Sequence, residues 1–226
     1  MSFALVVAAV VAAGPAAPAA GTYDTEGAWG HLELKKGRFK IDALGGNAHT
    51  CGLEGVWKGA TGFTDGDDVK CELKFVAKPE GAVEIVPVTE DACRNYCGVR
   101  ATFDGTYFPP LPGCTSAEVK KVRASFKAQF DAKKYAEALA TLEPMFSKCE
   151  KRLDRFDQQW VRNDLAITAH HAGDDAQCLK WLEPLGELRD PADADEAYGE
   201  PAFEEIMKKI AKATRTNAQR CGYKKK

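Results

Sequence analysis

Eight cysteines constrain this 226-residue chain more than any other feature of its sequence. All of them come after residue 50, behind an apolar N-terminal stretch. An even number of cysteines behind an export signal is typical of disulfides rather than of metal or redox chemistry. The sequence therefore predicts an oxidising compartment and disulfides that involve Cys51, Cys71, Cys93, Cys97, Cys114, Cys149, Cys178 and Cys221.

The first twenty residues have the layout of a secretory signal peptide. An apolar stretch from Phe3 to Ala13 is followed by small residues, with candidate cleavage sites at Ala19 and Ala20. The stretch is shorter than the ~20 residues that a membrane-spanning helix needs. We therefore expect residues 1–20 to be a signal peptide, and the mature chain to be periplasmic or secreted without a membrane span.

Residues 21–108 alternate between apolar and polar side chains with a period of two, which is typical of strands. Turns rich in glycine, asparagine and aspartate separate the stretches. Short antiparallel strands of this kind can curl into a small barrel or sandwich. The expected strands cover residues 29–34, 38–44, 53–58, 69–76, 82–88 and 100–107.

A proline-rich linker at 109–115 separates this region from residues 116–226, where the apolar period becomes 3.6. Thr115 and Glu118 have the spacing of a capping box at a helix start. Residues 133–145 align with residues 173–185 at an offset of 40, and both segments contain Leu-Glu-Pro. A repeat of this length predicts paired helices in a solenoid, closed by a final amphipathic helix. The expected fold class is α+β, with the antiparallel β domain followed by helical hairpins.

The repeat resembles a degenerate tetratricopeptide pair over residues 116–186. Phe126, where the family prefers a small residue, and Lys133, where it prefers glycine, depart from the family pattern. The resemblance implies antiparallel hairpins whose first helices line a concave surface. The residues that carry it are Ala138, Leu142, Asn163, Asp164, Leu165, Ala166 and Gly173.

Such hairpins imply two of the disulfides. Cys114, at the start of the first helix, would lie beside Cys149 at the end of the second, within the ~7 Å that a bridge allows between Cα atoms. Cys178 would likewise lie beside Cys221 in an antiparallel capping helix. A bridge between Cys149 and Cys178 disagrees with the hairpins, because a register difference of about eleven residues separates them by ~16 Å along the axis.

The remaining four cysteines belong to the β region. By elimination we expect Cys51 to pair with Cys71, and Cys93 with Cys97. Sequence alone leaves all three connectivities of four cysteines open. The segment from Cys93 to the linker would then be a turn that a disulfide closes.

The same resemblance suggests a binding surface. Its concave side would carry side chains from the first and third helices, with a basic rim around aromatic rings. Such a surface suits an extended or helical peptide that bears a carboxylate. The alternative is that the aromatic residues and Ile167 belong to the core. The candidate partner-binding residues are Lys120, Arg123, Lys127, Phe130, Trp160, Asn163 and His170.

Catalytic and metal sites have little support in the sequence. The serines of the mature chain are Ser116, Ser125 and Ser147, and none lies in a Gly-x-Ser-x-Gly elbow. Complete pairing of the cysteines leaves no free thiolate. His170 and His171 are adjacent on a helix and point about 100° apart, so they are badly placed to share one ion. We expect no catalytic residue, no cofactor and no metal.

Charge excludes one class of partner. Up to Cys114 the chain has 10 basic and 14 acidic residues, and beyond it 21 basic and 19 acidic residues. Net charges of −4 and +2 are too small for a nucleic-acid-binding face.

Three functions agree with these features. The first is a non-enzymatic adaptor of the bacterial envelope that binds another envelope protein or peptide through its helical half. The second is an inhibitor or immunity protein against a lysozyme-like cell-wall hydrolase. The stretch from Cys149 to Arg162 resembles secreted bacterial lysozyme-inhibitor-like proteins, which implies this role. The third is an envelope hydrolase that uses a pair of carboxylates.

Overall fold

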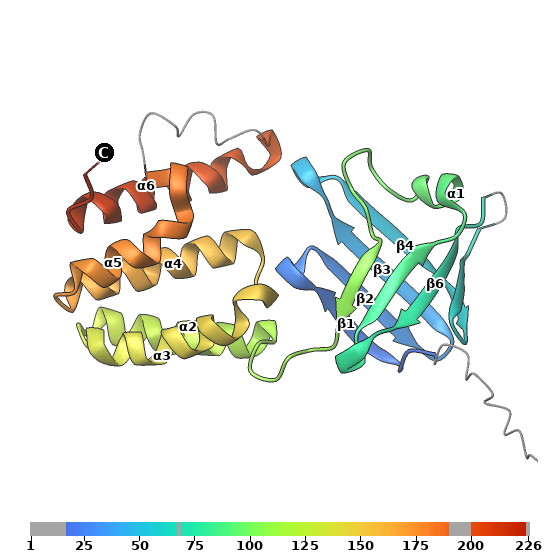
Figure 1. Cartoon of the computed structure of the whole chain (residues 1–226), viewed down its shortest axis with the longest axis horizontal. Coiled ribbons are helices and arrows are strands. Elements are labelled where there is room, and N and C mark those ends of the chain that lie inside the picture. Colours follow the sequence, from blue (N-terminus) through green and yellow to red (C-terminus); the bar gives the residue numbers. More distant parts are fainter. Residues whose placement is uncertain (1–16, 67–68, 190–199, 225–226) are drawn as a thin grey trace, which may run out of the picture.

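A computed structural model describes residues 17–66, 69–189 and 200–224. A β barrel and a set of helices lie side by side, joined by an irregular segment after the last strand (Figure 1). The chain is therefore α+β, with an antiparallel barrel followed by helices. Most of the expected signal peptide, residues 1–16, lies outside the described residues. Within the described ranges, no helix has both the length and the apolar character needed to cross a membrane.

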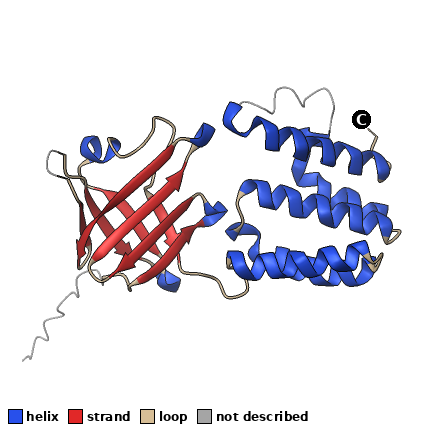
Figure 2. Ribbon diagram, turned by 180° about the vertical axis from the view of Figure 1, so that it is seen from behind, coloured by secondary structure: helices blue, strands red, loops and turns tan. Residues whose placement is uncertain are grey.

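Antiparallel strands close into an eight-stranded barrel, in which each strand pairs with its neighbours in sequence and β8 pairs with β1. Figure 2 shows the strands crossing at an angle in the barrel wall. The prediction missed β1 and β5, because β5 is only four residues long and β1 follows directly on the apolar leader. The strands are β1 (Gly21–Thr25), β2 (Gly30–Lys35), β3 (Arg38–Leu44), β4 (Thr50–Lys58), β5 (Thr61–Thr64), β6 (Glu72–Ala77), β7 (Val83–Pro87) and β8 (Gly105–Phe108).

Aromatic and aliphatic side chains fill the barrel. Tyr107, Phe39 and Phe75 are fully buried, and the rings of Phe39 and Phe75 lie 5.5 Å apart. Gly62 faces this cluster, because a Cβ at this position would lie 2.5 Å from the ring of Phe75. The barrel interior is therefore a packed core, as in other small eight-stranded barrels.

The two barrel disulfides join Cys51 to Cys97 and Cys71 to Cys93. The expected pairs Cys51–Cys71 and Cys93–Cys97 are therefore wrong. A short helix, α1 (Glu90–Arg94), lies beside the barrel (Figure 1) and carries Cys93 to the cysteine just before β6. Cys97, after this helix, forms a backbone bridge with Cys51 in β4. The segment between Cys93 and Cys97 is thus a strap that joins two strands, not a self-closed turn.

In the described ranges, five helices of eight or more residues follow the barrel. The first four form two hairpins, α2 with α3 and α4 with α5, and the last helix packs against α4. A capping box between Thr115 and Glu118 starts the first helix, as the sequence predicts. The helices are α2 (Ser116–Asp131), α3 (Tyr135–Cys149), α4 (Arg155–His171), α5 (Asp175–Leu182) and α6 (Glu204–Arg220).

The turns of the two hairpins have the same backbone. In the first, the N–H of Lys133 donates to the carbonyl of Phe130; in the second, Gly173 donates to His170. Lys133 has φ of 59° and Gly173 has φ of 88°, the left-handed conformation that commonly ends a helix. Each residue of the second turn lies 40 positions after its counterpart. The repeat in the sequence is therefore also a repeat in the backbone of the two turns, whereas α5 ends at Leu182 and the corresponding residue Leu142 lies inside α3.

The two helical disulfides agree with the sequence prediction. Cys114 pairs with Cys149, with Cα atoms 5.3 Å apart, and joins the start of α2 to the end of α3. Cys178 pairs with Cys221, with Cα atoms 6.2 Å apart, and joins α5 to the residue after α6. Each half of the helical region therefore has its own covalent link.

A few contacts join the barrel to the helices. The side-chain oxygen of Asn47 accepts a hydrogen bond of 2.9 Å from the N–H of Ala202. The guanidinium of Arg152 lies 4.4 Å from the ring centre of Phe108. Arg152 belongs to the 3-10 turn Glu150–Arg152, just before α4. These contacts place the N-terminal ends of α4 and α6 at the junction with the barrel.

Candidate functional site

A groove of about 710 Å³ lies between α2 and α4. Its floor contains the buried side chains of Val119 and Phe126 on α2, and of Leu153 before α4. At the barrel end, Ala28 and Arg152 line it. The groove is thus apolar at its base and opens beside the junction of the two halves.

The sequence of α2 explains the wall of this groove. Val119 and Phe126 are seven residues apart and therefore share the apolar face that packs inward. Lys120, Arg123 and Lys127 lie on the adjacent stripe at i, i+3 and i+7. They line the groove as predicted from the sequence, and so does Phe130.

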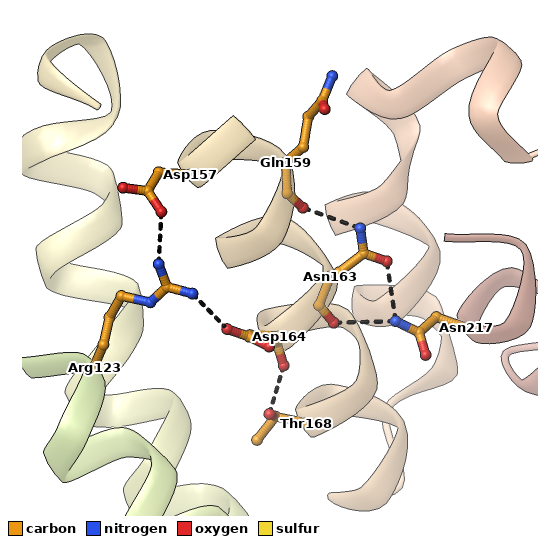
Figure 3. A network of polar contacts seen from close by, with 7 residues as sticks. All are labelled: Arg123, Asp157, Gln159, Asn163, Asp164, Thr168 and Asn217. Carbon is orange, nitrogen blue, oxygen red and sulfur yellow. Dashed lines mark hydrogen bonds and ion pairs between the residues drawn. The ribbon is translucent and has the colours of Figure 1, made fainter. Parts of the chain in front are cut away.

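Arg123 reaches across the groove to α4. Its Nη1 lies 2.7 Å from Oδ1 of Asp157, and its Nη2 lies 3.6 Å from Oδ2 of Asp164 (Figure 3). The two aspartates are seven residues apart, so they share one face of α4. The contact to Asp157 is a charge-assisted hydrogen bond, whereas the contact to Asp164 is too long for one. The guanidinium is thus held firmly on one side and loosely on the other.

Asp164 has an unusual protonation equilibrium. Burial raises its pKa to about 6, although Arg123 opposes the shift. The hydroxyl of Thr168 donates to the backbone carbonyl of Asp164 at 2.6 Å and not to its carboxylate (Figure 3). Arg123 is therefore the carboxylate's partner among the described residues. The side chain is mostly ionised at neutral pH and mostly protonated at pH 5.

Aromatic rings close the end of the groove that is far from the barrel. The ring of Phe130, at the end of α2, lies 5.7 Å from that of His171, at the end of α4. His171 also stacks on Tyr135 at 4.9 Å. Burial, together with the nearby charge of His170, lowers the pKa of His171. The imidazole therefore behaves as one more ring of this cluster near neutral pH.

Two cations near the barrel end have no carboxylate partner among the described residues. The ammonium of Lys120 is exposed, and the guanidinium of Arg152 rests on the ring of Phe108. Lys127, in contrast, pairs with Asp131 at 2.6 Å. The end of the groove beside the barrel thus has two cations without a carboxylate partner among the described residues, and the carboxylate of Asp154 lines it as well. At the centre of the groove, Arg123 faces two aspartates.

The structure does not place Trp160, Asn163 and His170 in the groove. Trp160 packs against a buried cluster of α6. Asn163 is only 2% exposed, and its amide nitrogen donates to the hydroxyl of Thr214 at 2.9 Å. Nδ1 of His170 lies 2.6 Å from a carboxylate oxygen of Asp175. These three residues belong to the packing of α4 against α5 and α6.

The observed groove-facing side of α4 differs from the predicted one by a rotation of one residue. Asp164 and His171 face α2, and each comes one position after a predicted residue, Asn163 or His170. One position corresponds to 100° around a helix. A spacing of seven residues from Asp157 to Asp164 and from Asp164 to His171 marks this face in the sequence. That spacing is the signal that could have located the α4 wall.

Buried amides fix this rotation. The Nδ2 of Asn163 donates to the carbonyl of Gln159 at 3.0 Å, and its Oδ1 accepts from Asn217 of α6 at 3.1 Å (Figure 3). Asn217 also donates to the backbone carbonyl of Asn163 at 3.2 Å. Buried polar groups of this kind are costly unless they are hydrogen-bonded. The network therefore holds α4 with Asn163 toward α6 and Asp164 toward α2.

One cluster near α6 has the composition of a metal site. His170, Asp175 and Cys221 place possible ligand atoms within 4.8 Å of one another. The sulfur of Cys221 is already bonded to Cys178, so it offers no thiolate. A histidine and a carboxylate are too few for the four ligands of a structural zinc site.

No protein-family model, curated protein or solved structure matches this chain. The resemblances to tetratricopeptide repeats and to lysozyme-inhibitor-like proteins therefore stay predictions.

Proposed function

We propose that this chain is an exported, non-enzymatic protein-binding protein. Its helical half would hold a peptide segment of another envelope protein in the groove between α2 and α4. The observation that carries this proposal is the combination of an apolar floor with two cations, Lys120 and Arg152, that have no carboxylate partner among the described residues. Such a combination suits a segment with apolar side chains and a carboxylate.

The hairpin architecture supports the same surface. The turns of the α2–α3 and α4–α5 hairpins have the same hydrogen-bond pattern 40 residues apart, and α6 follows as a closing helix. In a tetratricopeptide-like array, the first helix of each hairpin faces the binding surface. Here these are α2 and α4, the two walls of the groove. The four disulfides are those of an oxidising, extracytoplasmic compartment, where an envelope partner would be present.

The test compares two neighbouring lysines of α2. Lys120 lines the groove, whereas Lys121 lies 100° around the helix and outside it. Fluorescence anisotropy would measure the binding of a labelled, end-blocked peptide of leucine and glutamate. We expect Lys120→Glu to weaken binding about tenfold, or ~1.4 kcal/mol. We expect Lys121→Glu, with the same charge change, to stay within about twofold.

Two results would contradict the proposal. One is equal weakening by Lys120→Glu and Lys121→Glu, which would show that only net charge matters. The other is equal binding of the leucine–glutamate peptide and its leucine–glutamine counterpart, which would show that no carboxylate is read.

One observation favours a hydrolase as a second candidate. Asp157 and Asp164 face the same groove. The pKa of Asp164 is raised, whereas the carboxylate of Asp157 accepts a hydrogen bond from Arg123. Pairs of carboxylates in unequal environments serve as acid and base in glycosidases. Arg123, however, occupies the space between them (Figure 3). Release of sugars from peptidoglycan by the wild type, and its loss in Asp164→Asn, would establish this alternative.

The inhibitor hypothesis would use the barrel instead. Val56 on β4 and Phe63 on β5 are paired neighbours on the outer wall, and they are 48% and 41% exposed. Such a pair could contact a hydrolase. A lysozyme inhibition assay separates this role from groove binding. Inhibition that Phe63→Asp abolishes and Lys120→Glu leaves intact would assign the function to the barrel.

A further inference from the structure

We propose that Asp164 is a built-in competitor for the peptide. A ligand carboxylate takes its place on Arg123, and Asp164 takes up a proton from solvent as the ligand binds. This inference rests on the proposed function, because it concerns a peptide in the groove between α2 and α4. It identifies the partner as a segment with an acidic side chain or a free carboxyl terminus, and it couples binding to acidity.

The geometry of Arg123 carries the first step. Its hydrogen bond to Asp157, at 2.7 Å, anchors one side of the guanidinium. Its other side contacts Asp164 at 3.6 Å, outside hydrogen-bond range. A guanidinium presents several N–H groups in a fixed fork and can bind two carboxylates at once. A ligand carboxylate can therefore replace the loosely held partner without breaking the anchor.

The charges of the groove centre carry the second step. With both aspartates ionised, Asp157 and Asp164 outnumber Arg123 and leave one uncompensated negative charge. A third carboxylate nearby would be repelled, because like charges in a half-buried site disfavour ionisation. Protonation of Asp164 removes this repulsion. The exchange is balanced: one proton moves from solvent to Asp164, one ligand carboxylate moves to Arg123, and no covalent bond in the chain changes.

Other charged groups share the groove with Asp164. Cations and carboxylates come from α2, from the turn before α4 and from α4 itself. His171 lies near the far end, and its pKa is lowered, so the test must separate it from Asp164. The charged groups in the groove besides Asp164 are Lys120, Arg123, Lys127, Asp131, Arg152, Asp154 and Asp157.

The expected effect of pH on binding follows from the fraction of Asp164 that is protonated. A pKa of about 6 leaves roughly 3% of Asp164 protonated at pH 7.5 and about three-quarters at pH 5.5. If only the protonated form admits the ligand carboxylate, apparent affinity scales with that fraction. Binding at pH 5.5 should then be about twentyfold tighter than at pH 7.5.

The experiment is calorimetric titration of the full mature chain with the blocked leucine–glutamate peptide. Measurements at pH 5.5 and 7.5, in two buffers with different heats of ionisation, count the protons taken up. For the wild type we expect about twentyfold tighter binding at pH 5.5 and uptake of about one proton at pH 7.5. For Asp164→Asn we expect tight binding at both pH values without proton uptake.

Two controls make the result specific to Asp164. His171→Gln should keep the wild-type ratio of affinities between the two pH values. In the wild type, the carboxyl carbon signal of Asp164 should titrate near pH 6, and its midpoint should rise when the peptide is added. This signal tests the inference even if a variant folds poorly.

Each outcome separates this inference from the proposed function. Binding that does not depend on pH, or a pH dependence that Asp164→Asn retains, overturns the proton coupling and leaves the groove as the binding surface. If His171→Gln binds the peptide with the same affinity at pH 5.5 and pH 7.5, the histidine takes up the proton, and the inference is also overturned. Absence of binding at both pH values overturns the proposed function, and the inference with it.

Discussion

The barrel and the helical half pack their interiors in different ways. In the barrel, every strand pairs on both sides, and Tyr107, Phe39 and Phe75 fill the centre. In the helical half, Arg123 and the rings of Phe130 and His171 span from α2 to α4, with an open groove between the helices. The closed barrel has a packed interior that suits a stable scaffold. The open groove between α2 and α4 has polar contacts at its centre, and it is there that we propose a peptide binds.

The largest expected effect is on the barrel core. Phe75→Ala removes a fully buried ring and should lower the free energy of unfolding by about 3–5 kcal/mol. Phe130→Ala, at a half-buried groove position, should cost less than about half of that, because the side chain is already partly exposed. Denaturant unfolding measures both variants. Equal losses would break the distinction between a packed core and an open groove.

Removal of a helical disulfide should have the next largest effect. Replacement of Cys178 and Cys221 by alanine opens a loop with a sequence separation of 43 and should cost about 2–4 kcal/mol. Thermal unfolding with and without reductant checks this value. If the double variant unfolds at the wild-type temperature, the link between α5 and the end of α6 does not stabilise the helical half.

The buried amides of α4 and α6 give a smaller effect. Asn163→Ala removes the side-chain acceptor of the buried Asn217 amide and the donor to the buried hydroxyl of Thr214, and should cost about 1–3 kcal/mol. Thr216→Ala, which removes a solvent-exposed hydrogen bond to the backbone of α6, is the control and should change stability by less than about 0.5 kcal/mol. A double-mutant cycle with Asn217→Ala should show coupling. Additive losses would mean that the network does not fix the rotation of α4.

The smallest predicted effect depends on pH. The pKa of Asp164 is about 6 in the folded chain and 3.8 as an unperturbed group, so the protonated form favours folding. The contribution of protonated Asp164 to the free energy of unfolding is complete below pH 3.8 and is lost as the pH rises through 6. Since the side chain is one-third exposed, we expect a loss of only about 1 kcal/mol.

A matched variant isolates this contribution. Asp164→Asn should be more stable than the wild type at pH 7.5 and similar to it at pH 4. The difference between the two proteins is informative, because hydrogen bonds from Thr115 lower the pKa of Glu118 and Arg155 lowers that of Glu200. Those groups act in the opposite direction, since their stabilisation is lost as pH falls. A constant difference across the pH range would contradict the raised pKa of Asp164.

Periodicity predicted the overall division into strands and helices, because each apolar pattern directly reflects burial. The helical disulfides followed from hairpin geometry, which fixes where Cys114 and Cys149 lie. The barrel disulfides did not, because they depend on the path of a strap between strands. That path places Cys93 and Cys97 against different strands and leaves no local pattern in the sequence.

The sequence predicted the α2 wall of the groove but not the α4 wall, because only the first follows from a local pattern. Arg123 lies on a regular polar stripe of α2, so its position follows from the spacing of its neighbours. The α4 wall was shifted by one residue, because Asn163 looks like a surface residue in the sequence. Its burial depends on Asn217 and Thr214, more than 50 residues away. A long-range amide contact, and not the local pattern, sets which face of α4 lines the groove.

Chemical-shift mapping tests the central claim most directly. Amide signals of the isotope-labelled chain would be followed while the blocked leucine–glutamate peptide is added at pH 5.5. The account predicts that the shifted signals cluster on α2 and α4, around Lys120, Arg123 and Asp164, and that the barrel is unchanged. Shifts that cluster on the barrel wall around Phe63, or no shifts at all, would contradict it.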